Sequence, residues 1–291
     1  MKTLLLTIAL GAGAIPRAAD DPLRARSVQI LQAALRTEER WIKVHAAEAL
    51  IAAGQPDGVA RAFEAELAAR GAEPQYRIGI WRVLAQTAPT EPKRDTWIAR
   101  IVAAFLDTGG PDRLHAAEAL GKFGYRAHEG EIGAFQLAAG AGRGSLAADA
   151  QWVLANGSDE AVGPLVTMLA SEDRGTRNDA AYAIRYLPKL SPASWQKLAL
   201  AAQQSWMGNA ERVTFVSAAF VHAPEKEKAF FKAELLKYLS VGTNDEKLEV
   251  CAALAVKGVK ADTARLTPLL DSPVTDVRIG AAQAILRISR R

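Results

Sequence analysis

Residues 43–54 read KVHAAEALIAAG and residues 113–124 read RLHAAEALGKFG, so the hexapeptide HAAEAL occurs twice. Alanine and leucine dominate both segments and favour helix, and the apolar positions recur every three or four residues. Six further segments share this pattern, and they begin at Arg77, Leu146, Arg177, Arg212, Lys247 and Val277. The sequence therefore predicts eight similar helices.

These helices recur at a regular interval. Their matching large apolar residues stand roughly 30 to 37 residues apart, the length of a helical-hairpin repeat. They are Leu50, Leu84, Leu120, Val153, Ile184, Val221, Leu254 and Ile285. A second apolar-periodic segment generally lies between neighbours, such as VARAFEAELAAR at 59–70. We predict an all-α fold, an α-solenoid of stacked antiparallel helix pairs, with a single array of about eight units over residues 20–291.

The repeat resembles the HEAT repeat family over most of the chain. In the last unit, SPVTDVRIGAAQAIL at 272–286, the run 276–278 is similar to the Asp-Val-Arg pattern of that family. HAAEALGKFG is similar to the form found in phycobilisome-lyase-type HEAT-like repeats. The middle units depart from the acidic-basic pair, with Asn178-Asp179 in one of them. The resemblance implies an armadillo-type superhelix that serves as a binding scaffold, with the second helix of each pair on the concave side.

The N-terminal residues 1–14, MKTLLLTIALGAGA, have the order of a secretory signal peptide. Lys2 precedes an apolar stretch from Leu4 to Leu10, and small residues follow up to Ala14. The apolar stretch is far shorter than the roughly 20 residues that span a bilayer. We predict cleavage at residue 14 or as far along as residue 19, a periplasmic or secreted location and no stable membrane span.

Charge and cysteine content exclude two other classes. The net charge is only +4, and lysines and arginines are scattered among acidic residues, so we expect no nucleic acid partner. Cys251 is the one cysteine, which excludes an intramolecular disulfide. Because Cys251 lies in an apolar helical run, we predict a buried structural thiol.

The candidate partner-binding residues lie on the second helices. Glu48, Arg82 and Glu118 occupy matching positions as alternating charges, and Trp81 and Trp152 stand beside them. The same position continues through the later units, and we call the whole set the column: Glu48, Arg82, Glu118, Gln151, Tyr182, Ala219, Ala252 and Gln283. We predict that the column is a surface that binds a protein or peptide; a merely solvated face is the alternative interpretation.

Two histidine-glutamate pairs invite a metal-binding interpretation. His45 with Glu48 and His115 with Glu118 each place two potential ligands three residues apart on one helical face. Packed helices lie about 8 to 10 Å apart, so His45 and His115, two units apart, are expected about 20 Å from each other. The two pairs therefore cannot share one ion. We predict no catalytic residues, no metal site and no cofactor.

The sequence leaves three interpretations of function. The first is an exported, non-catalytic scaffold that binds a protein or peptide through the repeat surface. Residues 74–92 resemble helical repeats attached to sodium/solute symporters in some bacteria, so an accessory module of a membrane transporter is the second. The phycobilisome-lyase-type resemblance makes a lyase-type enzyme the third. The oligomeric state stays open.

The last helix has an apolar stripe that needs a cover. Terminal repeats of a solenoid normally present a polar outer face. Residues 279–291, IGAAQAILRISRR, run to the last residue without a following unit. Either Arg287, Arg290 and Arg291 supply the polar face, or a partner covers the stripe.

Overall fold

The computed structural model describes residues 21–204 and 208–291, so the predicted signal peptide lies outside the described residues. Within these ranges the chain forms sixteen α-helices with short 3-10 segments and no β-strand. This confirms the predicted all-α class. None of the described helices is both long enough and apolar enough to cross a bilayer.

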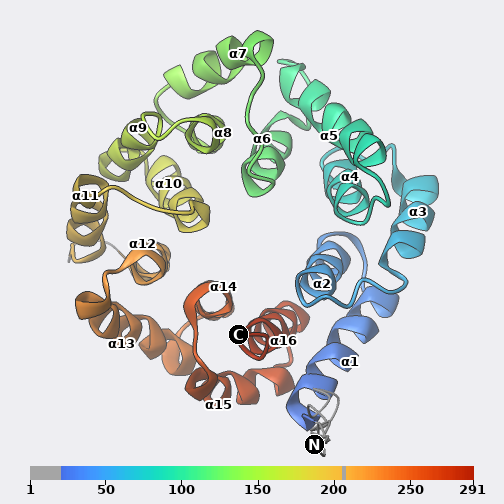
Figure 1. Ribbon diagram of the computed structural model, residues 1–291, viewed down its shortest axis with the longest axis vertical. Coiled ribbons are helices and arrows are strands. Elements are labelled where there is room, and N and C mark those ends of the chain that lie inside the picture. Colours follow the sequence, from blue (N-terminus) through green and yellow to red (C-terminus); the bar gives the residue numbers. More distant parts are fainter. Residues whose placement is uncertain (1–20, 205–207) are drawn as a thin grey trace, which may run out of the picture.

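The eight similar helices of the sequence form an inner layer (Figure 1). Their bounds are α2 (Arg40–Ala52), α4 (Tyr76–Gln86), α6 (Arg113–Lys122), α8 (Ser145–Gly157), α10 (Arg174–Tyr186), α12 (Asn209–His222), α14 (Asn244–Lys257) and α16 (Thr275–Ile288). Alanines and larger apolar residues are buried on one face of each inner helix, as the pattern of small and large apolar residues predicts.

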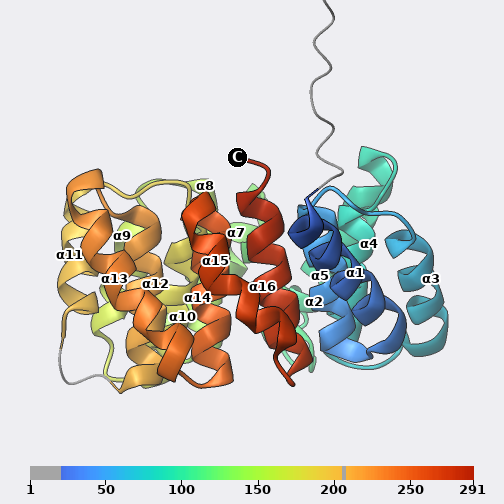
Figure 2. The same ribbon diagram turned by 90° about the horizontal axis from the view of Figure 1, so that it is seen from below.

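The intervening helices form the outer layer (Figure 1). They are α1 (Pro22–Thr37), α3 (Val59–Arg70), α5 (Glu91–Leu106), α7 (Glu129–Gly140), α9 (Val162–Thr167) with η2 (Met168–Ala170), α11 (Pro192–Ala202), α13 (Glu225–Val241), and α15 (Thr263–Leu266) between η3 (Lys260–Asp262) and η4 (Thr267–Asp271). Short turns join the two layers, which makes neighbouring helices antiparallel. The inner helices therefore all run in the same direction (Figure 2).

Hydroxyl side chains in the turns act as helix caps. Ser191 begins α11 by accepting a hydrogen bond of 3.2 Å from the backbone N–H of Ser194, and Pro192 takes the first helical position. Thr243 begins α14 with a reciprocal pair of hydrogen bonds to Glu246. These local signals end one helix and start the next, and they set the length of each unit.

The solenoid closes into a ring, because α16 packs on α1 and α2 (Figure 1). Leu31 of α1 and Ile285 of α16 are fully buried in the same hydrophobic cluster. Thr275 donates a hydrogen bond of 3.0 Å to Glu38, and Arg290 donates one of 2.9 Å to the carbonyl oxygen of Ala52. The chain's own first helix pair thus covers the apolar stripe of α16. Both expectations for that stripe, shielding by arginines or by a partner, are therefore wrong.

The hydrophobic core consists of two clusters. The larger one extends from α8 to α16 and continues across the closure into α1 to α4, and the smaller one occupies α4 to α8. Phe105 and Phe135 stack with ring centroids 4.0 Å apart in the smaller cluster. Cys251 is fully buried, and burial raises the pKa of its thiol to about 12. The prediction of a buried structural thiol is confirmed.

Candidate functional site

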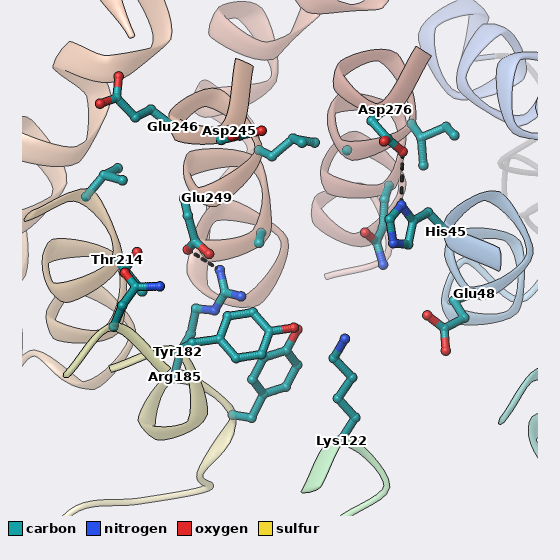
Figure 3. Close-up of a pocket in the computed structure, with 18 of the residues that line it drawn as sticks. His45, Glu48, Lys122, Tyr182, Arg185, Thr214, Asp245, Glu246, Glu249 and Asp276 are labelled. Atoms are coloured by element: carbon teal, nitrogen blue, oxygen red, sulfur yellow. Dashed lines mark hydrogen bonds and ion pairs between the residues drawn. The ribbon is translucent and has the colours of Figure 1, made fainter. Parts of the chain in front are cut away.

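The inner helices surround a cavity of about 890 Å³ at the centre of the ring (Figure 3). Residues from both ends of the inner helices line it, so the cavity extends along their length. Most of the lining residues are charged, amide or tyrosine, and Val213, Leu248 and Ile279 add apolar surface from α12, α14 and α16. Its volume lies in the range of ligand-binding sites, roughly 300 to 1,000 Å³.

A bidentate ion pair on the cavity wall joins α2 to α4. Arg82 donates from Nε to Glu48 Oε1 at 2.6 Å and from Nη2 to Oε2 at 2.9 Å, and Gln86 also donates to Glu48 at 2.8 Å. Burial alone would raise the pKa of the Glu48 carboxyl, but Arg82 and Lys122 outweigh it and lower that pKa. The pair fixes the first two residues of the column against each other.

Glu118 is a member of the polar network on α6. Burial opposes its charge, yet Lys122, with Nζ 2.7 Å from Oε1, and Arg82 hold the pKa of Glu118 at about 2. The hydroxyl of Tyr182 on α10 donates to the same carboxylate at 3.4 Å. The alternation of charges that the sequence predicts for Glu48, Arg82 and Glu118 is thus present in the structure.

Arg185 extends the network from α10 to α14. Its Nη1 lies 2.6 Å from Glu249 Oε2, and its guanidinium lies 5.0 Å and 5.1 Å from the ring centroids of Tyr182 and Tyr186. Lys122 faces the Tyr182 ring at 5.5 Å. Figure 3 shows Lys122, Tyr182 and Arg185 at the cavity, with Glu249 paired to Arg185.

Asp149 of α8 is a buried carboxyl beside this network. Burial is the main cause of its raised pKa of about 8, and the negative charges of Glu118 and Asp179 add to it. Glu118 keeps its charge through Lys122 and Arg82, so its neighbour Asp149 holds a proton near neutral pH. Asp149 is 5% exposed and is not among the residues that line the cavity.

Some side chains from helices two units apart meet across the ring. Arg185 and Glu249 meet across α12 at 2.6 Å, and the ring of Trp41 on α2 stacks 5.4 Å from His115 on α6. Closure turns the inner faces toward one another. Gly79 on the intervening α4 leaves room for the second contact, because a Cβ there would lie 3.0 Å from Trp41.

The two histidine-glutamate pairs do not form a metal centre together. Nδ1 of His45 lies 3.0 Å from Asp276 of α16, and Nδ1 of His115 is buried with no hydrogen-bond partner among the described residues. Burial lowers the pKa of His115. In the described part of the chain, no group of three or more His, Cys, Asp or Glu side chains could hold a metal ion.

Both tryptophans of the predicted surface point away from the cavity. Trp152 is fully buried against Tyr182 and Tyr186, and a Cβ at Gly121 would lie 2.4 Å from its ring. Trp81 is half-buried, with its Nε1 enclosed and without a partner among the described residues. Each stands one residue from the column, about 100° around the helix. Trp152 therefore cannot contact a partner directly, and the cavity wall does not include Trp81.

Five residues of the column line the cavity: Glu48, Arg82, Tyr182, Ala252 and Gln283. Glu118, Gln151 and Ala219 are not among the lining residues. The sequence interpretation missed two further sets of lining residues on the same helices. Gln86, Lys122, Tyr186 and Arg287 stand four residues after it in their units, and Asp245 and Asp276 stand seven residues before it. Residues four or seven apart share one helical face. Extending the column by one or two turns would have found both sets.

Comparisons with known proteins do not identify a family for this chain. No protein family model matches it, and no curated protein does. Two crystal structures of engineered proteins from the Northeast Structural Genomics Consortium each share 19% sequence identity with it. One aligns with a TM-score of 0.33 over 90% of this chain and 78% of its own, and the other with 0.27 over 91% and 96%. The HEAT repeat resemblance stays a prediction.

Proposed function

We propose that this protein is an exported, non-catalytic scaffold that binds a protein or peptide partner in the centre of its ring. The observation that carries the proposal is the 890 Å³ cavity, which the described residues leave unfilled and line with charged and aromatic side chains. Three of the five predicted contact residues, Glu48, Arg82 and Glu118, belong to the polar network around it.

Preorganisation of the wall supports binding over a merely solvated face. Arg82 and Arg185 are nearly fully buried and are fixed by ion pairs of 2.6 Å. Side chains that are already ordered lose little conformational entropy when a ligand binds. Tyr186 remains 45% exposed beside them, and tyrosine is a frequent contact residue at binding sites.

Site-specific crosslinking tests the proposal. A photo-crosslinking amino acid in place of Gln283, which lines the cavity, should capture a partner in the cells that produce the protein. The matched control is the same replacement of Gln136, an exposed residue of the outer helix α7. Capture at position 283 but not at 136 supports the proposal. Equal capture at both positions, or capture at 136 alone, contradicts it.

Export needs its own test. Cell fractionation followed by mass spectrometry of the N-terminal peptide should find the protein outside the cytoplasm, beginning between residues 15 and 20. A protein recovered from the cytoplasm with residues 1–14 intact would contradict export, while binding in the ring would stand.

A further inference from the structure

The central cavity has opposite charges at its two ends. Asp245 of α14 and Asp276 of α16 line it at the same level, in the first turns of adjacent inner helices (Figure 3). The contact of Asp276 is the imidazole of His45, and Asp245 has no ion pair among the described residues. Neither carboxylate thus faces a lysine or arginine of its own. Glu246 of α14 and Arg174 of α10 also line the cavity in first turns, and Arg174 lies 3.8 Å from Glu211. With Arg174 beside that carboxylate, Asp245, Glu246 and Asp276 leave this end acidic.

Hydrogen-bond donors gather at the other end. Lys122 and Arg287 both stand four residues after the column, in the last turns of α6 and α16, and Gln86 and Tyr186 share their level. Lys122 contacts Glu118, whereas Arg287 has no ion pair within the described ranges. Because Lys122 is paired with Glu118, the net positive charge of this level is that of Arg287, and one full charge exceeds the half charge of a helix end.

The middle of the cavity is neutral. The pairs Arg82–Glu48 and Arg185–Glu249 cancel each other's charge there. Asp276 and Arg287 are eleven residues apart on one helix, which corresponds to about 16 Å at about 1.5 Å per residue. An extended peptide rises about 3.3 Å per residue, so about five residues connect the acidic level to the basic one.

Closure of the ring decides which part of a partner can enter. A chain end passes lengthwise into the cavity, whereas an internal segment of a folded partner would have to enter doubled back or thread through. A terminal carboxylate is planar and accepts two parallel hydrogen bonds from a guanidinium, which fits Arg287. A lysine or arginine side chain of the same peptide fits the two aspartates at the opposite end.

We propose that the cavity binds the extended C-terminal end of a polypeptide, with its carboxylate at Lys122 and Arg287 and a basic side chain about four residues upstream at Asp245 and Asp276. This inference rests on the proposed function and adds the ligand's chemistry and direction. The peptide enters through the acidic end of the ring, and its last residue reaches the basic end.

Random heptapeptide libraries test the inference, one with free C-terminal carboxylates and one with C-terminal amides. The purified protein should enrich peptides from the free-acid library that carry lysine or arginine four or five positions before the C-terminus. Amidation of an enriched peptide should weaken its binding at least tenfold in fluorescence anisotropy. Absence of enrichment, equal binding of acid and amide, or selection for a basic C-terminal residue would overturn the inference.

Variants separate recognition from helix stability. R287Q should weaken the free acid at least tenfold and leave the amide unchanged, and D276N should weaken only peptides with the basic residue. R265Q, on the exposed outer face of α15, is the control and should change neither. If R287Q and D276N lower thermal stability and leave binding unchanged, the charges serve only the helix ends and the inference is wrong. If crosslinking at position 283 captures a partner but neither peptide library is enriched, the proposed function stands and this ligand is wrong.

Discussion

Arg290 donates a hydrogen bond of 2.9 Å to the carbonyl oxygen of Ala52, although 238 residues separate them in the sequence. The bond caps the C-terminal end of α2 with a side chain from the end of α16. Together with Leu31 and Ile285 in one cluster, it joins the first and last described helix pairs. The closed ring, and with it the enclosed cavity, depends on this junction.

Leu31→Ala should loosen both sides of the junction at once. Leu31 is fully buried, so its truncation should cost about 2 to 5 kcal/mol. Hydrogen exchange should show faster exchange in α1 and α16 together, because each covers the other. Leu198→Ala in α11 is the control, because Leu198 is equally buried on another part of the ring. It should leave the difference in hydrogen exchange rate between α16 and α14 unchanged. Unchanged protection of α16 in Leu31→Ala would contradict ring closure in solution.

Gly121→Ala should destabilise the inner layer. The added Cβ would lie 2.4 Å from the Trp152 ring, which is fully buried and cannot move without disturbing Tyr182 and Tyr186. We expect a loss of about 1 to 3 kcal/mol in urea unfolding. Gly133→Ala in α7 meets no atom within 4 Å and should instead gain about 0.5 to 1 kcal/mol from helix propensity. Equal effects of the two substitutions would show that Trp152 does not occupy this position.

Asp149→Asn should change the pH dependence of stability. The folded pKa of about 8 is above the ordinary value of 3.8, so between these values the folded state binds more protons than the unfolded state. Stability is therefore lost as pH rises from about 4 to about 8, and neutral asparagine removes that loss. In thermal melts, the melting temperature of Asp149→Asn should depend less on pH than that of the wild type. The variant's gain in melting temperature over wild type should be largest at pH 8 to 9. Parallel wild-type and variant profiles would mean that Asp149 is ionised throughout.

Glu48→Gln should expose the cost of an unpaired buried arginine. Arg82 is 2% exposed, and without Glu48 its guanidinium loses both charge-assisted hydrogen bonds. We expect Glu48→Gln to lower the free energy of unfolding by about 3 kcal/mol. The double variant with Arg82→Met should lose less than the sum of the two single losses. Asp159→Asn is the control: it breaks the exposed pair with Lys189 and should change the free energy of unfolding by no more than about 0.5 kcal/mol. Additive losses for Glu48 and Arg82 would contradict a direct pair.

Local patterns were sufficient to predict the helices, and the resemblance to HEAT repeats implied which helix of each pair lies on the concave side. The HAAEAL segments at 43–54 and 113–124 lie on α2 and α6 of the inner layer, and VARAFEAELAAR at 59–70 is α3 to the residue. Helix formation depends on neighbours three and four positions away, so a single segment contains the signal. The charged column could be found in the same way, because Glu48, Arg82 and Glu118 have matching positions in their units.

Closure and the contacts across the cavity could not be predicted from these patterns. Whether α16 meets α1 depends on the small rotation between successive units, summed around the array, and no single segment specifies that angle. The pair Arg185–Glu249 spans two units and follows from the same curvature. The tryptophans were misjudged for a different reason: a shift of one residue from the column turns a side chain by about 100°, from the cavity into the core.

The junction between α16 and the first helix pair also fixes how many repeats the protein can have. An open array can gain or lose a unit at one end, because each unit contacts only its neighbours. Here one extra pair would displace α16 from α1 and α2 by about a helix diameter, roughly 10 Å, and would separate Leu31 from Ile285. Duplication of a single unit, the usual route by which repeat proteins lengthen, would break the circle. The circumference thus constrains the evolution of the repeat array: units can be added or lost between α1 and α16 only in steps that bring α16 back to α1 and α2.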